Sequence, residues 1–308
     1  MGVTKREAYF NSTDGINKVH VYYWLDTEAT PVAILQLSHG LGEHTGRYED
    51  FALYLAEKGF IVCGNDHLGH GKTAPTIGEL GDFGAPDAYI RMVDDMHVLH
   101  NIMVKHYPKL PYFILGHSMG SFCARLYAFD FGDELAGAIF SGSACMPDAL
   151  SLLEEPLEAA VEKSGRNKRA SSSDTMYRMI GKYLFDEDDA YAWLCASKDD
   201  REKIIADPLC GSDMTMGSLL TLFKLATKCN SEDWYKNFPK DLPVLVVSGV
   251  KDIVGEYGHG VTKLTDKLEQ NGVDVTMRLF PGLRHNILNE DDKDIVYNDI
   301  YSWLSQHI

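Results

Sequence analysis

Residues 116–120 of this 308-residue sequence read GHSMG, a spacing of glycine and serine that can build a nucleophile. In the G-x-S-x-G pattern, a tight turn between a strand and a helix exposes the serine hydroxyl. The apolar run 112–115 before it is strand-like, and residues 119–131 after it are compatible with a helix. Glycines at both flanks leave room where a Cβ would collide with backbone. This context predicts that Ser118 is a nucleophile, although a five-residue pattern also arises by chance.

A second glycine-containing segment, SHGLGEH at residues 38–44, follows an apolar run at 32–37. In folds with this serine turn, the loop after this strand supplies one of two backbone N–H groups that bind the oxyanion of the tetrahedral intermediate. The other N–H comes from the residue after the nucleophile, Met119, and position in the loop assigns the first to Leu41. Each donor contributes about 3 kcal/mol of transition-state stabilisation. The alternative is a plain turn that needs glycine for positive φ.

An acid and a base are expected later in the chain, each in a loop that follows a strand. Asp252 lies just past one strand-like run, and His285 lies just past the next. In such a set the aspartate fixes the tautomer of the imidazole, which takes the proton of Ser118 and then gives it to the leaving group. The alternatives are a helix-capping aspartate and a merely polar histidine, and Glu256 is the substitute for the acid.

These loops need a sheet whose strands end at one edge. Apolar runs typical of buried strands alternate with helical patterns in the first half of the chain and again after residue 242. This βαβα order predicts an α/β fold with a mostly parallel central sheet and helices on both faces. We expect strands at residues 18–25, 32–37, 60–64, 112–115, 135–141, 243–248 and 273–280, and helices at 46–58, 87–106, 119–131, 259–270 and 292–305.

Residues 146–236 interrupt this alternation, because they contain helical segments and many charges but no run typical of a buried strand. We interpret them as a helical insertion at one edge of the sheet. The predicted core domain is then formed by residues 1–145 and 237–308 together.

Several stretches of the sequence resemble the monoacylglycerol lipase and lysophospholipase branch of the α/β-hydrolase superfamily, also described as serine aminopeptidase-like (S33-type). One departure is Leu68, where this branch commonly has arginine, which leaves a local ion pair in question but not the chemistry. Within the insertion only ADPLC at 206–210 is similar. The matching stretches are HGLGEHTGRY at 39–48, NDHLGHGKT at 65–73, GHSMG at 116–120, SGVKD at 248–252 and GLRHNILNE at 282–290.

The resemblance implies an α/β-hydrolase fold with nucleophile Ser118, acid Asp252, base His285 and the oxyanion-binding amides of Leu41 and Met119. It also implies that the insertion is a lid over an acyl-binding pocket, and that esters of glycerol or lysophospholipids are the substrates. Apolar residues of the lid could line an acyl channel or could belong to the packing of the lid itself. They are Leu150, Leu152, Leu153, Leu157, Met176, Met179, Leu219, Leu220 and Phe223.

The predicted reaction is two-step ester hydrolysis through an acyl-enzyme, which requires no cofactor. An aminopeptidase on the same fold is a second hypothesis. It would need a carboxylate pair for the substrate amine, for which Glu154-Glu155 and residues 186–189 are candidates. A non-catalytic binding protein on a hydrolase scaffold is a third hypothesis, and such proteins usually lack a member of the catalytic set.

Two features of the first hundred residues could suggest a nucleotide or a metal. GHGKT at 69–73 ends like a phosphate-binding P-loop, but that pattern needs glycine where Asp66 stands. No metal is expected either, because the spacing of the nearby histidines matches no standard ligand set. These histidines are His39, His44, His67 and His70.

The composition is that of an ordinary globular protein with a formal net charge of −16, which argues against nucleic acid as a partner. We expect no stable membrane insertion, because no apolar run approaches the roughly 18 residues of a span. The N-terminal residues lack the apolar core of a signal peptide, and the six cysteines have no paired spacing. The predicted location is therefore cytoplasmic, with reduced thiols. The predicted partner is a small-molecule acyl ester, and the sequence sets no oligomeric state.

Overall fold

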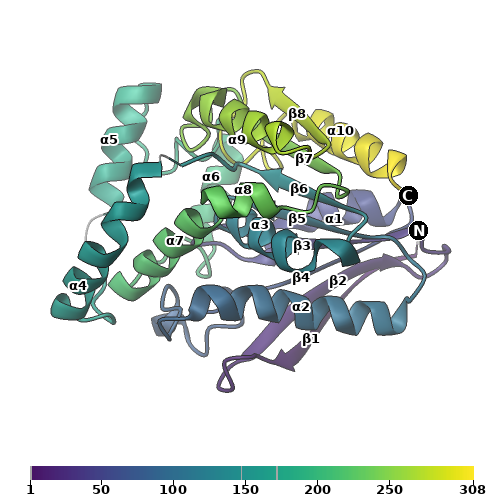
Figure 1. Ribbon diagram of the computed structural model, residues 1–308, viewed down its shortest axis with the longest axis horizontal. Coiled ribbons are helices and arrows are strands. Elements are labelled where there is room, and N and C mark those ends of the chain that lie inside the picture. The colour runs from purple at the N-terminus through teal and green to yellow at the C-terminus, as the bar shows by residue number, and fades with distance from the viewer. Residues whose placement is uncertain (1, 147, 171–172) are drawn as a thin grey trace.

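The computed structural model describes residues 2–146, 148–170 and 173–308, without the side chains of residues 148–150 and 173–177. Its centre is one eight-stranded sheet in the order β1-β2-β4-β3-β5-β6-β7-β8 (Figure 1). The pairs formed among β3 to β8 are parallel, whereas β1–β2 and β2–β4 are antiparallel, so the predicted mostly parallel sheet is confirmed. The strands are β1 Val3–Asn11, β2 Lys18–Asp26, β3 Ala33–Ser38, β4 Phe60–Asn65, β5 Tyr112–His117, β6 Gly137–Ser141, β7 Val244–Gly249 and β8 Val275–Phe280.

The central strands are buried on both faces, which explains their nearly continuous apolar sequences. Because side chains alternate along a strand, Val244 and Val246 of β7 join one apolar cluster while Leu245 and Val247 join another. The first cluster lies under three helices, and the second lies under two helices on the opposite face (Figure 1). The first set is α2 Ala88–His106, α3 Met119–Phe131 and α9 His259–Gln270, and the second is α1 Glu49–Ala56 and α10 Lys293–Gln306.

Strand β1 is absent from the predicted elements. It pairs with β2 residue by residue, from Val3 opposite Asp26 to Asn11 opposite Lys18. Most of its residues are exposed at the edge of the sheet, so its sequence lacks the apolar run of a buried strand. The predicted helix 46–58 also differs in detail, because it starts as a 3-10 turn at Thr45–Tyr48 before α1.

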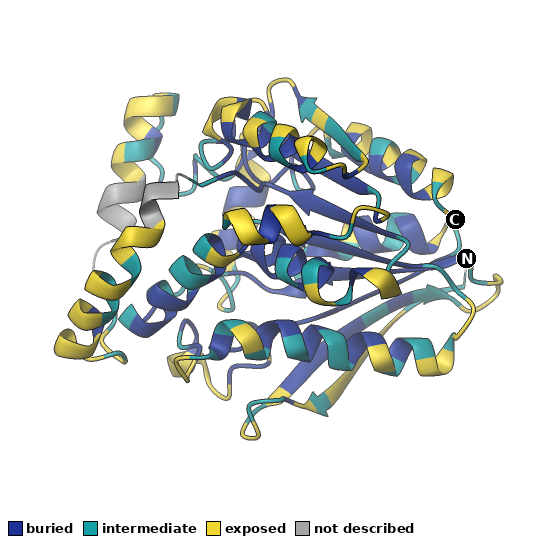
Figure 2. Cartoon of the chain, viewed as in Figure 1, coloured by how far each residue is buried: buried dark blue, intermediate teal, exposed yellow. Residues whose placement is uncertain are grey.

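Between β6 and β7 the chain forms helices instead of strands. Helices α4 and α5 are mostly exposed, whereas α7 packs against α2 and α3 (Figure 2). No helix formed by the described residues is both long and apolar enough to cross a membrane. The elements of this segment are η4 Asp148–Leu153, α4 Glu154–Ser164, α5 Ser173–Phe185, α6 Lys198–Ala206, α7 Met216–Lys228 and α8 Glu232–Asn237.

Arg125 of α3 joins both ends of this helical segment to the sheet-forming part of the chain. Its side chain is fully buried and donates hydrogen bonds to the carbonyl oxygen of Ala144, at 3.0 Å, and to that of Cys229. The guanidinium also lies over the ring of Trp234, 4.5 Å from its centroid. One buried arginine therefore fixes the place where the chain leaves the sheet and the place where it returns.

Candidate active site

Ser118 lies at the turn between β5 and α3, where the nucleophile is predicted. Its φ of 54° and ψ of −122° fall outside the regions that residues other than glycine usually adopt. A Cβ on Gly116 would lie 2.2 Å from the carbonyl oxygen of Gly120, and a Cβ on Gly120 would lie 2.0 Å from that of Ser38. Backbone contacts therefore exclude any side chain at these two positions, as the motif predicts.

His285 and Asp252 lie in the loops after β8 and β7, and the fold brings their side chains into contact. Nδ1 of His285 is 3.0 Å from each carboxylate oxygen of Asp252. Asp252 is fully buried and also accepts hydrogen bonds from the hydroxyl of Ser248 and the N–H of Val254, both at 2.9 Å. Burial opposes ionisation, but attraction to His285 and these hydrogen bonds hold the pKa of Asp252 below its usual value. The carboxylate is thus ionised and can orient the imidazole.

Two aromatic rings lie against the imidazole of His285. The ring of His117 is 4.7 Å away between centroids, and that of Trp193, from the helical insertion, is 5.4 Å away. His117 is itself held at 3.2 Å from the hydroxyl of Ser141 and 3.1 Å from the side-chain oxygen of Asn286, and burial lowers its pKa to about 4. Nε2 of His285 is buried and has no hydrogen-bond partner among the described residues, so it is available to a hydroxyl.

A buried carboxylate shapes the loop between β3 and α1. Oε1 of Glu43 accepts hydrogen bonds from the N–H of Gly40 and the hydroxyl of Tyr48, both at 2.6 Å, and Oε2 lies 3.2 Å from Nε of Arg47. Burial opposes its ionisation, but attraction to His117 and Arg47 together with the hydrogen bonds lowers the pKa of Glu43 to about 2. The loop is therefore built around a fixed negative charge.

This loop lies directly beside Ser118. A Cβ on Gly40 would be 3.2 Å from Cβ of Ser118. The next residue, Leu41, packs against the same apolar cluster as Met119. The two residues predicted to supply oxyanion-binding amides therefore belong to the two backbone segments adjacent to Ser118.

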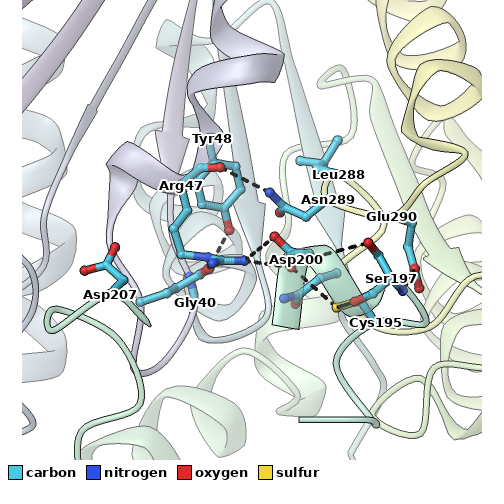
Figure 3. A network of polar contacts seen from close by, with 12 residues as sticks. Gly40, Arg47, Tyr48, Cys195, Ser197, Asp200, Asp207, Leu288, Asn289 and Glu290 are labelled. Atoms are coloured by element: carbon cyan, nitrogen blue, oxygen red, sulfur yellow. Dashed lines mark hydrogen bonds and ion pairs between the residues drawn. The ribbon is translucent and has the colours of Figure 1, made fainter. Parts of the chain in front are cut away.

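Ion pairs connect this loop to the helical insertion (Figure 3). Nη2 of Arg47 lies 3.0 and 3.1 Å from the two carboxylate oxygens of Asp200 in α6. Next to this pair, Nε2 of His44 lies 2.8 Å from Oδ2 of Asp207. The loop that approaches Ser118 is thus bonded to the insertion through both His44 and Arg47.

Two groups of described residues bring three potential metal ligands within 4.8 Å of one another. In one, His44 lies with Asp207 and Cys210. However, Nδ1 of His44 accepts a hydrogen bond from the N–H of Gly46, so its Nε2 carries the proton that faces Asp207. A metal would have to displace that proton. The other group is His97, His100 and Glu134.

The other histidines noted in the sequence lie below the loop as buried groups. Burial lowers the pKa values of His39, His67 and His70 to about 3, so all three are neutral at neutral pH. Asp66 accepts backbone N–H bonds from two loops, which is a structural role and not that of a P-loop position. Leu68 is buried in an apolar cluster, so no ion pair replaces the arginine of similar sequences at that position.

The sequence predicted the central residues of the site but not the groups that hold them. Glu43 and Glu290 lie inside stretches that carry the family resemblance, and His117 lies inside the G-x-S-x-G pattern, so their stretches were noted without a role. Trp193 has no signal in the sequence, because it lies in the insertion. Glu256, the alternative acid, is exposed, and Asp252 makes the contact with the imidazole.

The mostly parallel sheet, the serine turn between β5 and α3, and the contact between Asp252 after β7 and His285 after β8 define an α/β-hydrolase fold. The family model described as serine aminopeptidase, S33, matches residues 29–292. The chain therefore belongs to the serine aminopeptidase S33 family.

Individual relatives match nearly the whole chain. The monoacylglycerol lipase of Mycolicibacterium smegmatis is 26% identical over 313 residues, which cover 99% of both chains. Human monoglyceride lipase is 27% identical over 289 residues, 92% of this chain and 86% of the human one. Among solved structures, a highly thermostable carboxyl esterase from Bacillus coagulans in complex with glycerol has a TM-score of 0.90 at 31% identity, with 98% of each chain covered.

Proposed function

We propose that this chain hydrolyses carboxylic esters through an acyl-enzyme on Ser118, with His285 as the base and Asp252 as the acid. The observation that carries the proposal is the contact between the His285 imidazole and the buried Asp252 carboxylate. Their loops follow β8 and β7, which run parallel to β5 and β6, so the loops lie at the same edge of the sheet as the turn of Ser118. The chain is an esterase or lipase by its relatives, whose names are those of lipases and a carboxyl esterase over almost the full length.

In the first step His285 removes the proton of the Ser118 hydroxyl as its oxygen attacks the ester carbonyl. The N–H groups of Leu41 and Met119 would bind the oxyanion, since their segments lie on either side of the serine. The imidazolium then gives its proton to the alcohol, which leaves. In the second step water loses a proton to His285 and attacks the acyl-enzyme, which releases the carboxylic acid and restores Ser118.

The proposed substrate is a small acyl ester of glycerol. The Bacillus coagulans relative was solved in complex with glycerol, and the two curated relatives are named as lipases of monoacylglycerol. Lysophospholipids remain the second substrate class to test, since the sequence resemblance includes them.

We propose that the insertion, residues 146–236, is the lid that selects the acyl chain. Among the predicted lining residues, Leu219 is half-buried against the cluster that contains Met119, whereas Leu220 is buried. Leu152 and Met179 are exposed at 77% and 54%. Leu150 and Met176 lie outside the described side chains. Leu219 is the better candidate for the wall of an acyl channel, because it is partly accessible while it packs against this cluster.

Of the two candidate sets of amine-binding carboxylates for an aminopeptidase, Glu154-Glu155 and residues 186–189, the second is already engaged by cations. Glu187 lies 2.7 Å from Nη2 of Arg284 and 2.6 Å from Nη1 of Arg201, so its charge is already paired. Asp186 pairs with Lys182 in a similar way, at 2.7 Å. A free amine would have to compete with these cations.

The decisive experiment compares the purified wild-type protein with Ser118→Ala, His285→Ala and the exposed-serine control Ser302→Ala. We expect wild type and control to be labelled by a fluorophosphonate probe and to hydrolyse p-nitrophenyl butyrate and monoacylglycerols. Both active-site variants should lose at least about 10³-fold in turnover while unfolding at an unchanged temperature. A preference for aminoacyl anilides over esters would contradict the ester proposal. Absence of labelling in wild type would point to a binding protein.

A further inference from the structure

One buried carboxylate joins the loop of the base to the helical insertion. Glu290 follows His285 by five residues and is only 2% exposed. Its Oε1 accepts a hydrogen bond from the N–H of Arg284 at 3.0 Å, next to His285. The same carboxylate accepts the N–H of Ala196, at 2.9 and 2.8 Å, and Oε2 accepts the N–H of Ser197 at 3.0 Å (Figure 3).

The same two segments are bonded on both sides of His285. The N–H of Asn286 donates to the carbonyl oxygen of Leu194 at 2.7 Å. The guanidinium of Arg284 donates to the carbonyl oxygen of Ala192, which is 2.5 Å away. Together with the ring of Trp193 against the imidazole, these bonds place residues 192–197 beside residues 284–290, the base loop that carries His285.

We propose that Glu290 is a positioning residue for His285, and that it makes residues 192–197 of the insertion part of the frame that holds the base. This inference rests on the proposed function, in which His285 exchanges protons with Ser118. A small displacement of a base costs much in rate, because proton transfer needs hydrogen-bond distance. A buried carboxylate suits the role, because a charged acceptor makes stronger hydrogen bonds than a neutral one.

Replacement of Glu290 by glutamine tests this arrangement with almost no change in volume. Glutamine has one acceptor oxygen and one NH2 group that only donates. If its oxygen faces Arg284, the NH2 group faces the N–H of Ser197, and the reverse orientation has the same conflict on the other side. The glutamine side chain can therefore accept a hydrogen bond from the N–H of Arg284 in the base loop or from the N–H of Ser197 in the insertion, but not from both.

The experiment compares wild type, Glu290→Gln and the control Glu49→Gln, which removes an exposed carboxylate paired with Lys5. Active sites are counted by burst titration with a p-nitrophenyl ester, and kcat is expressed per titrated site. We expect kcat of Glu290→Gln to fall about 10- to 100-fold with KM changed less than about 3-fold, since binding groups are untouched. Fluorophosphonate labelling of Ser118 should slow in parallel. Hydrogen exchange should increase in residues 192–198 or 282–287, and Glu49→Gln should match wild type.

If Glu290 has a purely structural role, Glu290→Gln lowers the fraction of active sites but leaves kcat per site at the wild-type value. That result would overturn the inference. If Glu290→Gln yields no folded protein, Glu187→Gln decides, because Glu187 is partly exposed and bonds Arg284 from the insertion. A lower kcat per site in that variant supports the inference, and an unchanged one rejects it. If wild type itself shows neither ester turnover nor labelling, the proposed function is wrong, and the inference that rests on it fails with it.

Discussion

The backbone of Ser118 is held in its unusual conformation by neighbours that have no side chain. Such conformations cost on the order of 1–3 kcal/mol and persist only where the surroundings impose them. Here the carbonyl groups of Ser38 and Gly120 occupy the space that a Cβ on Gly120 or Gly116 would need. The serine conformation is therefore fixed by packing of the β3, β5 and α3 backbones and not by its own side chain.

The assignment of the acid can be tested at a single residue. Asparagine at position 252 can place its NH2 group against Nδ1 of His285, which favours the tautomer with the proton on Nε2 and removes the base from Ser118. We expect Asp252→Asn to lower kcat by about 10³- to 10⁴-fold. Glu256→Gln is the matched control and should keep near-normal activity, because Glu256 is exposed. Steady-state kinetics on one p-nitrophenyl ester decides, and the reverse pattern would transfer the acid role to Glu256.

Residues that follow strands were predictable, whereas residues that act through distant partners were not. The loops after parallel strands meet at one edge of a sheet, so Ser118, Asp252 and His285 could be assigned from their places behind apolar runs. Glu290 contacts Ala196, which is 94 positions away, and Arg47 contacts Asp200, which is 153 positions away. Nothing in the local sequence specifies such pairs, since the described part of the insertion forms no strand that would fix its position.

At the scale of elements, the insertion has two unlike parts. Helices α4 and α5 are largely exposed, and α4 packs against α7 and the preceding turn η4. Residues 187–211, in contrast, are bonded to the loop of His285 through Glu290 and to the loop after β3 through Arg47 and His44. Only the first part has the few buried contacts that allow local opening.

Leu219 of α7 offers a test of chain-length selection by the insertion. If it lines the acyl channel, Leu219→Trp should shorten the channel and lower kcat/KM for long-chain p-nitrophenyl esters relative to the butyrate by roughly 10-fold. Ile205→Trp on the surface of α6 is the control, because Ile205 is 62% exposed. Equal loss of activity on all chain lengths would place Leu219 in the packing of the insertion instead.

The sheet itself was predicted to the extent that its strands are buried. Each fully buried strand has an apolar run that the sequence displays, although the ends differ by one or two residues. Strand β1 was not predicted because it is an exposed edge strand, with alternation too weak to distinguish it from a loop.

For the molecule as a whole, buried neutral histidines predict instability in mild acid. Burial lowers the pKa values of His39, His67 and His70 to about 3 and that of His117 to about 4. In the unfolded chain the pKa of histidine is about 6.5, so below that pH the unfolded state binds more protons than the folded state. The contribution of these histidines to the free energy of unfolding is fully present above about pH 6.5. It falls as pH decreases toward the folded-state pKa values, by up to about 1.4 kcal/mol per pH unit for each histidine.

Urea denaturation at several pH values between 7.5 and 5 measures this slope. His70→Gln should reduce the slope by about one proton, because it removes one titrating group from the unfolded chain. A free energy of unfolding that stays constant over this range would show that the buried histidines do not control acid stability.

The anchoring of the insertion limits how its specificity can be re-engineered. Arg125 fixes its two ends, and residues 187–211 are bonded to the loop of His285 and to the loop after β3. Chimeras that exchange the whole of residues 146–236 with a relative would also replace one of the two partners in each contact with these two loops. Helices α4 and α5 make none of these contacts among the described residues, but Arg169 between them donates hydrogen bonds to the carbonyl oxygens of Leu80 and Gly78. Exchange of the two helices alone, with residues 166–170 kept, is therefore the change in the insertion that we expect to leave the loops around Ser118 and His285 intact.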